Sequence, residues 1–560
     1  MNRLRWQLLI VALALVVIAV LLLGQQPILR AFVPAPAEGG LYSEGLVGSM
    51  NRLNPLLDYA NPADQDINRL IFSGLIRFDD RGNPQPDLAE KWAVSLDGLV
   101  YNFTLRPDAL WHDGEALTTA DIVFTTNFLA HADTPIPENL RELWQSIEVV
   151  AFDELNMQFR LSEAFAPFLD YLAFGVLPEH LLRDTQPLDL SNSPFNLSPI
   201  GTGSYTFGEI LIEDGQIAGV VLEAFENHYF ERPFIDQIIF RYFENSEVAY
   251  QAYLEGEILG ISDVSEALLP SVLQDDTLNI YSSRLPKLSI VLLNLNKSSV
   301  PFFQEVEVRQ ALLQGVNRQK LIDTYLSGQG FVADGPILPG TWAYNENMAK
   351  VSFDSDQAVS ILKAAGYTIP AEGGAIRSKD GIRLSFELVH PDTELHGQVA
   401  ESIQENWAKL GVSVELVAVD YAILLSDYLE TGNYDAALVD LNLARTPDPD
   451  PYPFWHQAEA NGGQNYSRWD DRRASEYLEQ ARVSISQNQR TRLYRNFQTH
   501  FSIEMPALPL YYPIYNYALS AQVQGVSVGP LLQSSDRLAN INEWFLVARS
   551  ELEEVDSASE

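Results

Sequence analysis

The chain has 560 residues, more than a single hydrophobic core normally organises, so two or three domains are expected. Its formal net charge of -39 repels nucleic-acid phosphates and anionic lipid headgroups, which argues against nucleic-acid binding. The chain contains no cysteine, so disulfides, thiolate nucleophiles, Cys-ligated metal centres and a lipid-modified cysteine anchor are all excluded.

The first residues are typical of a segment that enters or crosses a membrane. Arg3 and Arg5 precede an uncharged apolar run from Leu8 to Leu23, and the positive-inside rule then places the body outside the cytoplasm. The nearest small-residue cleavage pattern, Ala35-Pro36-Ala37, lies far downstream, which favours an uncleaved anchor over a secretory signal. We expect residues 1–40 to comprise this anchor or signal segment and a linker from Pro34 to Gly40.

Local patterns predict the next elements in chain order. Alternation from Leu41 indicates a strand that breaks at Gly48 and Asn51. Apolar spacing at Ile67, Leu70, Ile71 and Leu75 then indicates a helix within residues 62–79. "YNFTLRP" alternates Tyr101, Phe103 and Leu105 on one face, as a half-buried strand does. After a turn, Thr118 and Asp121 have the spacing of a capping box that starts a helix.

The turn contains His112, Asp113 and Gly114, which together suggest a fragment of an active or metal site. Asp and Gly are the residues that a tight strand-to-helix connection requires, and no HxH or HExxH spacing supplies a second ligand or base. We therefore interpret His112 as structural. Similarly, "PIGTGSY" lacks the third glycine and the following helix of a phosphate-binding loop, so Gly201 and Gly203 indicate a chain crossing between domains.

From Ile235 onward, short strands and amphipathic helices alternate, which favours α/β organisation with helices covering the sheets. The stretch from Ala444 to Trp469 is rich in Pro, Asp and aromatic residues and is long for a connection. It is interpreted either as a functional surface or as a plain prolyl loop.

These stretches, in this order, resemble the bacterial extracellular solute-binding proteins of family 5, the peptide- and nickel-type receptors of ABC importers. The resemblance covers nearly all of Leu41 to Trp544. It rests on "NRLNPLL", "IFSGLIRFDDRGNPQPDLAEKWAVSLDGLVYNFTLRPDALWHDGEALTTADIVFT", "PIGTGSYTF", "VRQALLQGVNRQKLID" and "PALPLYYPIYNYALS".

The resemblance implies an α/β fold of the periplasmic-binding-protein type, with two lobes, an extra domain inserted in the first lobe, and a ligand cleft between the main lobes. The segments implied are 41–85, 199–286 and 507–544 for the first main lobe, 86–198 for the inserted domain, 287–506 for the second main lobe and 545–560 for an acidic tail.

The resemblance also implies a set of ligand-contacting residues. Peptide-binding members often hold the ligand's amino terminus with an acidic residue in the last loop, but here that position falls on or near Ala444, and Leu441 replaces the usual tryptophan. Asp440, Asp448 and Asp450 are close by in the sequence. The residues implied are Glu44, Gly45, Gly201, Tyr205, Asn294, Asp440, Asn442, Asp448, Trp455, Asn465 and Tyr466.

The function implied is an extracytoplasmic receptor that captures a peptide-like solute and delivers it to the permease subunits of an ABC importer, as a monomer with no cofactor and no enzymatic activity. Alternatives are a ligand sensor for a membrane partner and a receptor for a sugar or a metal chelate. Scattered histidines such as His228, His390 and His456 show no HxH or HExxH metal-ligand spacing. A remote alternative is a glycoside hydrolase that uses Asp448 and Asp450 as its acid/base pair.

Overall fold

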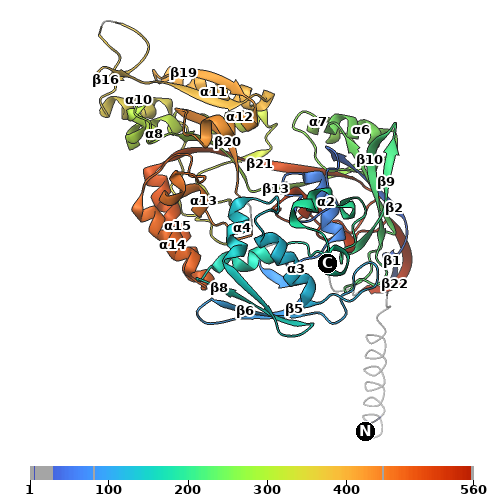
Figure 1. Cartoon of the computed structure of the whole chain (residues 1–560). Helices are drawn as coiled ribbons and strands as arrows, with labels where there is room; N and C mark the ends of the chain where they lie inside the picture. Colours follow the sequence, from blue (N-terminus) through green and yellow to red (C-terminus); the bar gives the residue numbers. More distant parts are fainter. Residues whose placement is uncertain (1–5, 7–28, 80–81, 372, 444–446, 556–560) are drawn as a thin grey trace.

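The computed structural model describes residue 6 and residues 29–79, 82–371, 373–443 and 447–555, and it has two main lobes and a third domain (Figure 1). One mixed sheet runs through both main lobes in the strand order β19-β18-β20-β14-β21-β12-β2-β11-β10-β9, and β13 and β15 also pair with β21. The α/β organisation expected from the alternating pattern is therefore present.

The first lobe is built on the β2 side of this sheet. Its predicted first strand is β2, which ends before Gly48, a residue with a left-handed φ of 121°. The predicted helix is shorter than expected, because it ends at Ile71 and leaves Leu75 outside. Ile71 O accepts a hydrogen bond from Gly203 N–H, so the glycine loop caps the helix there. The elements are β2 (Leu41–Val47), α2 (Pro62–Ile71), β9 (Tyr205–Glu213), β10 (Gln216–Ala224), β11 (Gln237–Phe243), α6 (Ser246–Leu254), β12 (Gly260–Ile261), α7 (Leu269–Val272), β13 (Leu278–Arg284), η7 (Ser534–Leu538) and η8 (Ile541–Glu543).

The inserted domain has its own four-stranded sheet in the order β5-β6-β8-β7. Both local predictions here are confirmed: Tyr101, Phe103 and Leu105 on β6 are buried, and Thr118 and Asp121 form the capping box of α3. The elements are the hairpin β3 (Ile76–Phe78) and β4 (Pro84–Pro86), then β5 (Ala89–Val94), β6 (Val100–Leu105), α3 (Thr119–Ala130), α4 (Glu138–Gln145), β7 (Ile147–Ala151), β8 (Asn156–Leu161), η1 (Ala166–Leu172), α5 (Glu179–Leu182), η2 (Pro187–Asn192) and η3 (Pro194–Leu197).

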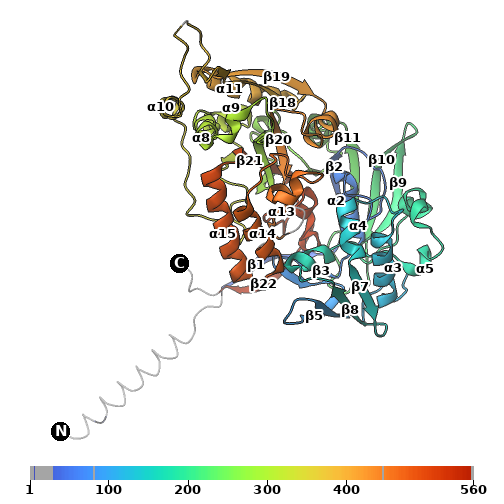
Figure 2. The ribbon, with the colours of Figure 1, turned by 60° about the vertical axis from the view of Figure 1, so that its left-hand side comes forward.

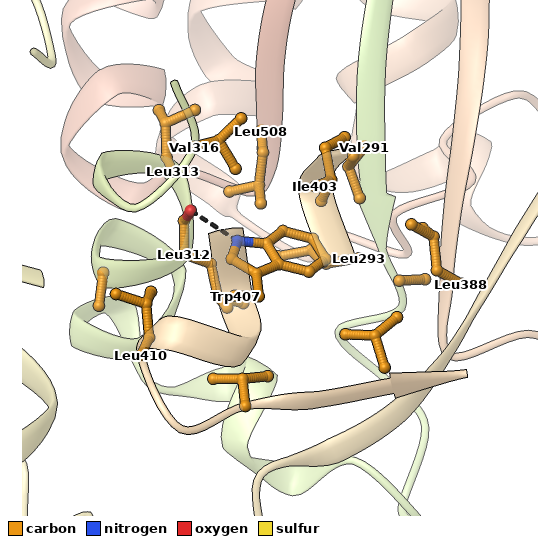
Figure 3. Close-up of a cluster of buried hydrophobic side chains, with 14 of the residues drawn as sticks. Val291, Leu293, Leu312, Leu313, Val316, Leu388, Ile403, Trp407, Leu410 and Leu508 are labelled. Atoms are coloured by element: carbon orange, nitrogen blue, oxygen red, sulfur yellow. Dashed lines mark hydrogen bonds between the residues drawn. The ribbon is translucent and has the colours of Figure 1, made fainter. Parts of the chain in front are cut away.

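The second lobe carries the other half of the sheet and covers it with helices. Its core includes Trp407, whose indole N–H donates to Leu312 O at 2.9 Å, so the largest side chain of this core has its polar atom satisfied (Figure 3). The elements are β14 (Lys287–Leu293), η4 (Pro301–Gln304), α8 (Val306–Gln314), α9 (Arg318–Tyr325), β15 (Gly330–Val332), α10 (Ser355–Ala364), β16 (Ser378–Lys379), β17 (Ile382–Arg383), β18 (Ser385–Pro391), α11 (Glu394–Lys409), β19 (Ser413–Val419), α12 (Tyr421–Ile423), η5 (Leu424–Leu429), β20 (Ala436–Asn442), α13 (Tyr452–Trp455), η6 (Gln457–Ala460), α14 (Arg472–Val483) and α15 (Gln487–Glu504).

One long strand, β21 (Ala507–Ser520), belongs to both lobes (Figure 1). Its residues 507–511 pair with β14 in the second lobe, and its residues 514–520 pair with β13 in the first. The chain crosses between the main lobes in this region through residues 284–287 and 511–514. Two adjacent crossings leave the lobes free to pivot, as hinge closure requires.

The inserted domain also packs on the second lobe, where α14 lies beside η1. Asp448 N–H donates to Asp170 Oδ2 at 2.6 Å, and the guanidinium carbon of Arg482 lies 5.8 Å from the ring centroid of Phe165. The domain that the chain inserts into the first lobe therefore has a second contact across the lobe boundary.

The two ends of the described chain form a separate two-stranded sheet, seen at the lower edge of the body in Figure 2. β1 (Leu29–Ala37) pairs antiparallel with β22 (Val547–Val555). This pairing corrects the expectation of a linker at 34–40 and a tail after 544, because each strand finds its partner at the opposite end of the sequence. The apolar segment 8–23 lies outside the described residues. Across the described ranges, no helix is both long and apolar enough to cross a membrane.

Candidate ligand-binding site

Polar side chains gather where the two main lobes meet, and the second lobe contributes an ion pair. Lys287 Nζ lies 2.9 Å from Asp440 Oδ2, and the lysine side chain is 48% exposed whereas the aspartate side chain is 16% exposed. His396, near the start of α11, places Nε2 3.4 Å from the same Asp440 oxygen. We call Lys287, His396 and Asp440 the second-lobe wall.

The second-lobe wall stabilises Asp440 as a carboxylate. Burial alone raises the pKa of this group, but the hydrogen bond from His396 and the charge of Lys287 outweigh burial and hold the pKa well below its usual range. The pKa of Lys287 is raised, first by Asp440. Asp440 is therefore already paired, whereas the lysine ammonium still reaches solvent.

The first lobe contributes two carboxylates opposite this wall. Asp263 follows β12, beside the crossing, because Val264 N–H donates to Asn516 O on β21. Its side chain is exposed, yet its pKa is raised, mainly because surrounding protein displaces water and next because Glu266 adds negative charge. The protein around Asp263 therefore removes part of its water, although the side chain reaches solvent. We call Asp263 and Glu266 the first-lobe wall.

The crossing strands contribute further polar and aromatic residues to the junction. Ser289 lies opposite both Asp440 and Tyr511 in the register, so the three side chains share one face of the sheet. Tyr421, after β19, is 53% exposed. Burial raises its pKa, and the nearby charge of Asp440 adds to the rise, so the ring lies near the second-lobe wall. The junction therefore combines charged walls with aromatic rings, as small-molecule sites do.

Of the residues predicted to contact ligand, Asp440 and Asn442 lie at this junction. Asn442 pairs with Lys287 in the β14–β20 register. Asn294 instead donates to Gly432 O and Tyr434 O at the other end of β20, about 20 Å away at roughly 3.3 Å per residue.

Two more predicted residues, Asn465 and Tyr466, lie with Asn294 at that far edge. Tyr466 O accepts from the Tyr434 hydroxyl, and Asn465 donates to His456 O and Trp469 O. The far edge has a polar hollow of about 520 Å³, to which Asn296 and Arg468 contribute. The long aromatic loop therefore leads away from the lobe junction.

Glu44, Gly45 and Tyr205 are interior residues of the first lobe. Glu44 has no exposed surface, and Arg537 donates to its Oε1 from Nε at 3.0 Å. Tyr205 is fully buried and donates to Ile235 O, and a Cβ on Gly45 would lie 2.8 Å from Ile258 Cδ1. Tyr205 and Gly45 serve packing, and Glu44 serves internal charge pairing.

Gly201 lies in a loop that His112 holds against α2. A Cβ on Gly201 would lie 1.9 Å from Ile71 O, so only glycine allows this loop to approach α2 so closely. His112 Nδ1 accepts from Gly201 N–H at 3.1 Å, which requires a neutral ring with its proton on Nε2, and Nε2–H donates to Gly203 O at 3.0 Å. The ring uses both nitrogens to hold the loop.

We expect His112→Gln to lower the free energy of unfolding by about 1–2 kcal/mol at pH 7.5, through the loss of well-aligned hydrogen bonds. Burial lowers the pKa of folded His112 to about 4, below its unfolded value near 6.5. The contribution of the neutral ring is therefore complete above pH 6.5 and is lost as the pH falls toward 4. Denaturant unfolding should show a smaller difference in unfolding free energy between the unaltered chain and His112→Gln at pH 4.5 than at pH 7.5. An equal difference at both pH values would contradict this role.

The last two predicted residues, Asp448 and Trp455, are buried in the second lobe. Asp448 forms an ion pair with Arg490, and Trp455 is 1% exposed. Asp450 Oδ2 accepts from Arg482 Nε at 2.7 Å. Because an arginine holds each carboxylate, neither has the apolar surroundings that a glycosidase general acid requires. Within the described ranges, no group of three metal-ligating side chains could hold a metal ion.

Sequence reasoning missed Asp263, Glu266, Lys287 and His396, which make up most of the two walls. Their position just after a strand could have identified them, because ligands of open α/β sheets bind beyond the carboxyl ends of the strands. Asp263 follows β12 and His396 follows β18, but the strand order had to be known before these ends could be placed together.

Known proteins of one family are similar to this chain in sequence. The model of the family "Bacterial extracellular solute-binding proteins, family 5 Middle" matches residues 83–464. The chain is 26% identical to the oligopeptide-binding protein AppA of Bacillus subtilis over 91% of this chain and 92% of that protein. It is 27% identical to the dipeptide-binding protein of Escherichia coli over 80% of this chain and 84% of that protein.

Solved structures show the same fold. The structure of Bacillus subtilis AppA with a nonapeptide has a TM-score of 0.72 at 24% identity, covering 92% of this chain and 100% of that one. The structure of NikZ from Campylobacter jejuni with Ni(L-His) has a TM-score of 0.73 at 25% identity, covering 90% and 99%.

Proposed function

The chain belongs to the bacterial extracellular solute-binding proteins of family 5, and on this premise we propose that it captures a peptide at the junction of its main lobes and delivers it to the permease of an ABC importer. The relatives named above bind oligopeptides and dipeptides, which supports a peptide as the solute. The family consists of binding proteins, so capture and release, without turnover, is the expected cycle.

The observation that carries the proposal is the junction itself. Asp263, Lys287 and Asp440 come from different lobes and lie beside two adjacent chain crossings. A solute with charged ends bridges the first-lobe and second-lobe walls when the lobes pivot together, and closure then removes water and strengthens each charged contact.

The N-terminal apolar segment 8–23 supports tethering of this receptor to the membrane, with the body outside. The body is proposed to act as a monomer. Membrane fractionation compares the full chain with a variant that begins at Leu29: retention of the full chain alone supports the tether, and release of both contradicts it.

The function is tested by native mass spectrometry of the chain purified without stripping bound solute. We expect short peptides of mixed sequence to co-purify, and a peptide mixture to raise the Tm; a ligand at a hundred times its Kd stabilises by about 2.7 kcal/mol. Small-angle scattering should show a smaller radius of gyration with peptide. Stabilisation by a sugar or a metal chelate, with no response to peptides, would contradict a peptide receptor.

A further inference from the structure

The inserted domain holds the second lobe at a point where the chain does not cross between the lobes. Asp448 N–H, in the second lobe, donates to Asp170 Oδ2 at 2.6 Å. In the same contact, the guanidinium carbon of Arg482 lies 5.8 Å from the ring centroid of Phe165 in the inserted domain. We call Phe165, Asp170, Asp448 and Arg482 the clasp, which joins the two bodies by a charge-assisted hydrogen bond and a cation–π contact.

The second-lobe half of the clasp keeps its own structure when the clasp parts. Arg482 Nε donates to Asp450 Oδ2 at 2.7 Å, and the Tyr452 ring centroid lies 3.6 Å from the same guanidinium carbon. Asp448 forms its ion pair with Arg490 inside the second lobe. Neither side chain depends on the inserted domain for its position, so the contact can open and re-form without unfolding the second lobe.

The inserted domain moves with the first lobe as one body. Leu56 and Leu57, which precede α2 in the first lobe, share one hydrophobic core with Phe103 and Trp111 of the inserted domain. His112 adds its two hydrogen bonds to the glycine loop. The clasp is thus a contact between the second lobe and the body against which the second lobe pivots.

The clasp and the second-lobe wall lie on opposite faces of the sheet that crosses between the lobes. Asp440 lies on one face, whereas its neighbour Leu441 points to the other, because side chains alternate along a strand. Leu441 packs in the core that includes Leu478 of α14, the helix that carries Arg482. Figure 1 shows the same arrangement, with α14 and α12 on opposite sides of β21.

Closing the solute side of the junction must therefore strain the clasp. The strands between the lobes are the hinge, and bending them toward the Asp440 face carries α14 away from the inserted domain. In the clasped arrangement, the side chain of Lys287 is 48% exposed and Tyr421 is 53% exposed. The clasp thus coexists with a solute side that is open to water.

We propose that the clasp holds the solute side of the lobe junction open, and that closure over a captured solute requires the clasp to part. The proposal rests on capture of a peptide by lobe closure at this junction. Each contact of the clasp then lowers the apparent affinity, because only the unclasped fraction of molecules can close. The inserted domain thereby sets the affinity without touching the solute.

Loosening the clasp should tighten binding. Phe165→Ala with Asp170→Ala removes the inserted-domain half and leaves the second-lobe side chains in place. With a mixed-sequence pentapeptide library and detection by mass spectrometry, we expect this full-length variant to retain peptides roughly tenfold better. The matched control, Phe152→Ala with Asp184→Ala, removes an exposed phenylalanine and an exposed aspartate elsewhere in the inserted domain and should change nothing.

Locking the clasp should have the opposite effect. The chain contains no cysteine, so one introduced pair gives one defined disulfide. A Cβ on Gly82, in the β3–β4 turn, would lie 3.1 Å from Pro447 Cβ beside Asp448, close to the spacing of about 3.5–4.5 Å in disulfides. In Gly82→Cys with Pro447→Cys, oxidation should lower peptide retention about tenfold or more and abolish the peptide-dependent change in radius of gyration. Reduction of the same molecule should restore both.

Two results would overturn the proposal while peptide capture stands. One is equal or better retention by the oxidised than by the reduced double-cysteine chain, because closure would then keep the clasp. The other is unchanged or weaker retention by the loosened variant with an unchanged Tm. Retention of no peptide by the unaltered chain overturns peptide capture itself.

Discussion

Replacing Arg537 with methionine is expected to lower the free energy of unfolding by about 3–5 kcal/mol, because it leaves buried carboxylates without their cation. Arg537 is fully buried and donates to Asp66 Oδ1 and Oδ2, each at 2.7 Å, and to Glu44 Oε1. The hydroxyls of Tyr42 and Tyr517 donate to the other Glu44 oxygen at 2.5 and 2.6 Å. Because Glu44 has no exposed surface, solvent does not compensate for the lost charge.

Chemical denaturation measures this loss, and two further variants isolate its cause. Combining Arg537→Met with Glu44→Gln and Asp66→Asn removes the uncompensated charges and should recover part of the stability. Arg160→Met breaks an ion pair in which Arg160 is 46% exposed and Glu148 is 64% exposed, and should cost less than about 1 kcal/mol. If Arg537→Met lowers the free energy of unfolding no more than Arg160→Met does, the buried Glu44 and Asp66 carboxylates do not depend on Arg537 for stability.

The second large effect is expected for Asp448→Asn, at about 3–5 kcal/mol as well. The substitution keeps the shape of the side chain but leaves the buried guanidinium of Arg490 without its ion-pair partner, and it weakens the acceptor for the Tyr494 hydroxyl at 3.2 Å. Asp448 also lies where the second lobe meets the inserted domain, through its backbone bond to Asp170.

Hydrogen exchange locates this effect. The amides of α15, which carries Arg490 and Tyr494, should lose protection, whereas those of β2 in the first lobe should keep it, because the lobes have separate cores. The exposed Asp470 on the same lobe is the matched control, and Asp470→Asn should leave both regions unchanged. A uniform loss of protection would mean that the two lobes unfold as one unit.

The structure places the residues that the resemblance indicated as ligand contacts at two different edges of the sheet. The resemblance indicated residues of β20 as ligand contacts, and two of them, Asp440 and Asn442, lie at the lobe junction. It also selected Asn294 and Asn465, which lie at the opposite edge of the sheet. The position expected to hold the amine, Ala444, lies outside the described residues. Sequence order along a loop does not reveal which edge of the sheet the loop returns to.

The sequence by itself determined the features whose causes lie within a few residues of one another: the alternation of β6, the capping box of α3, and the turn chemistry around His112. Only the tertiary structure decided which polar side chains are free to act. Glu44 is neutralised by Arg537, 493 residues later, and Asp440 by Lys287 on a neighbouring strand, whereas Asp263 has no such partner among the described residues. Charge pairing depends on distance in space, and strand order and register set that distance.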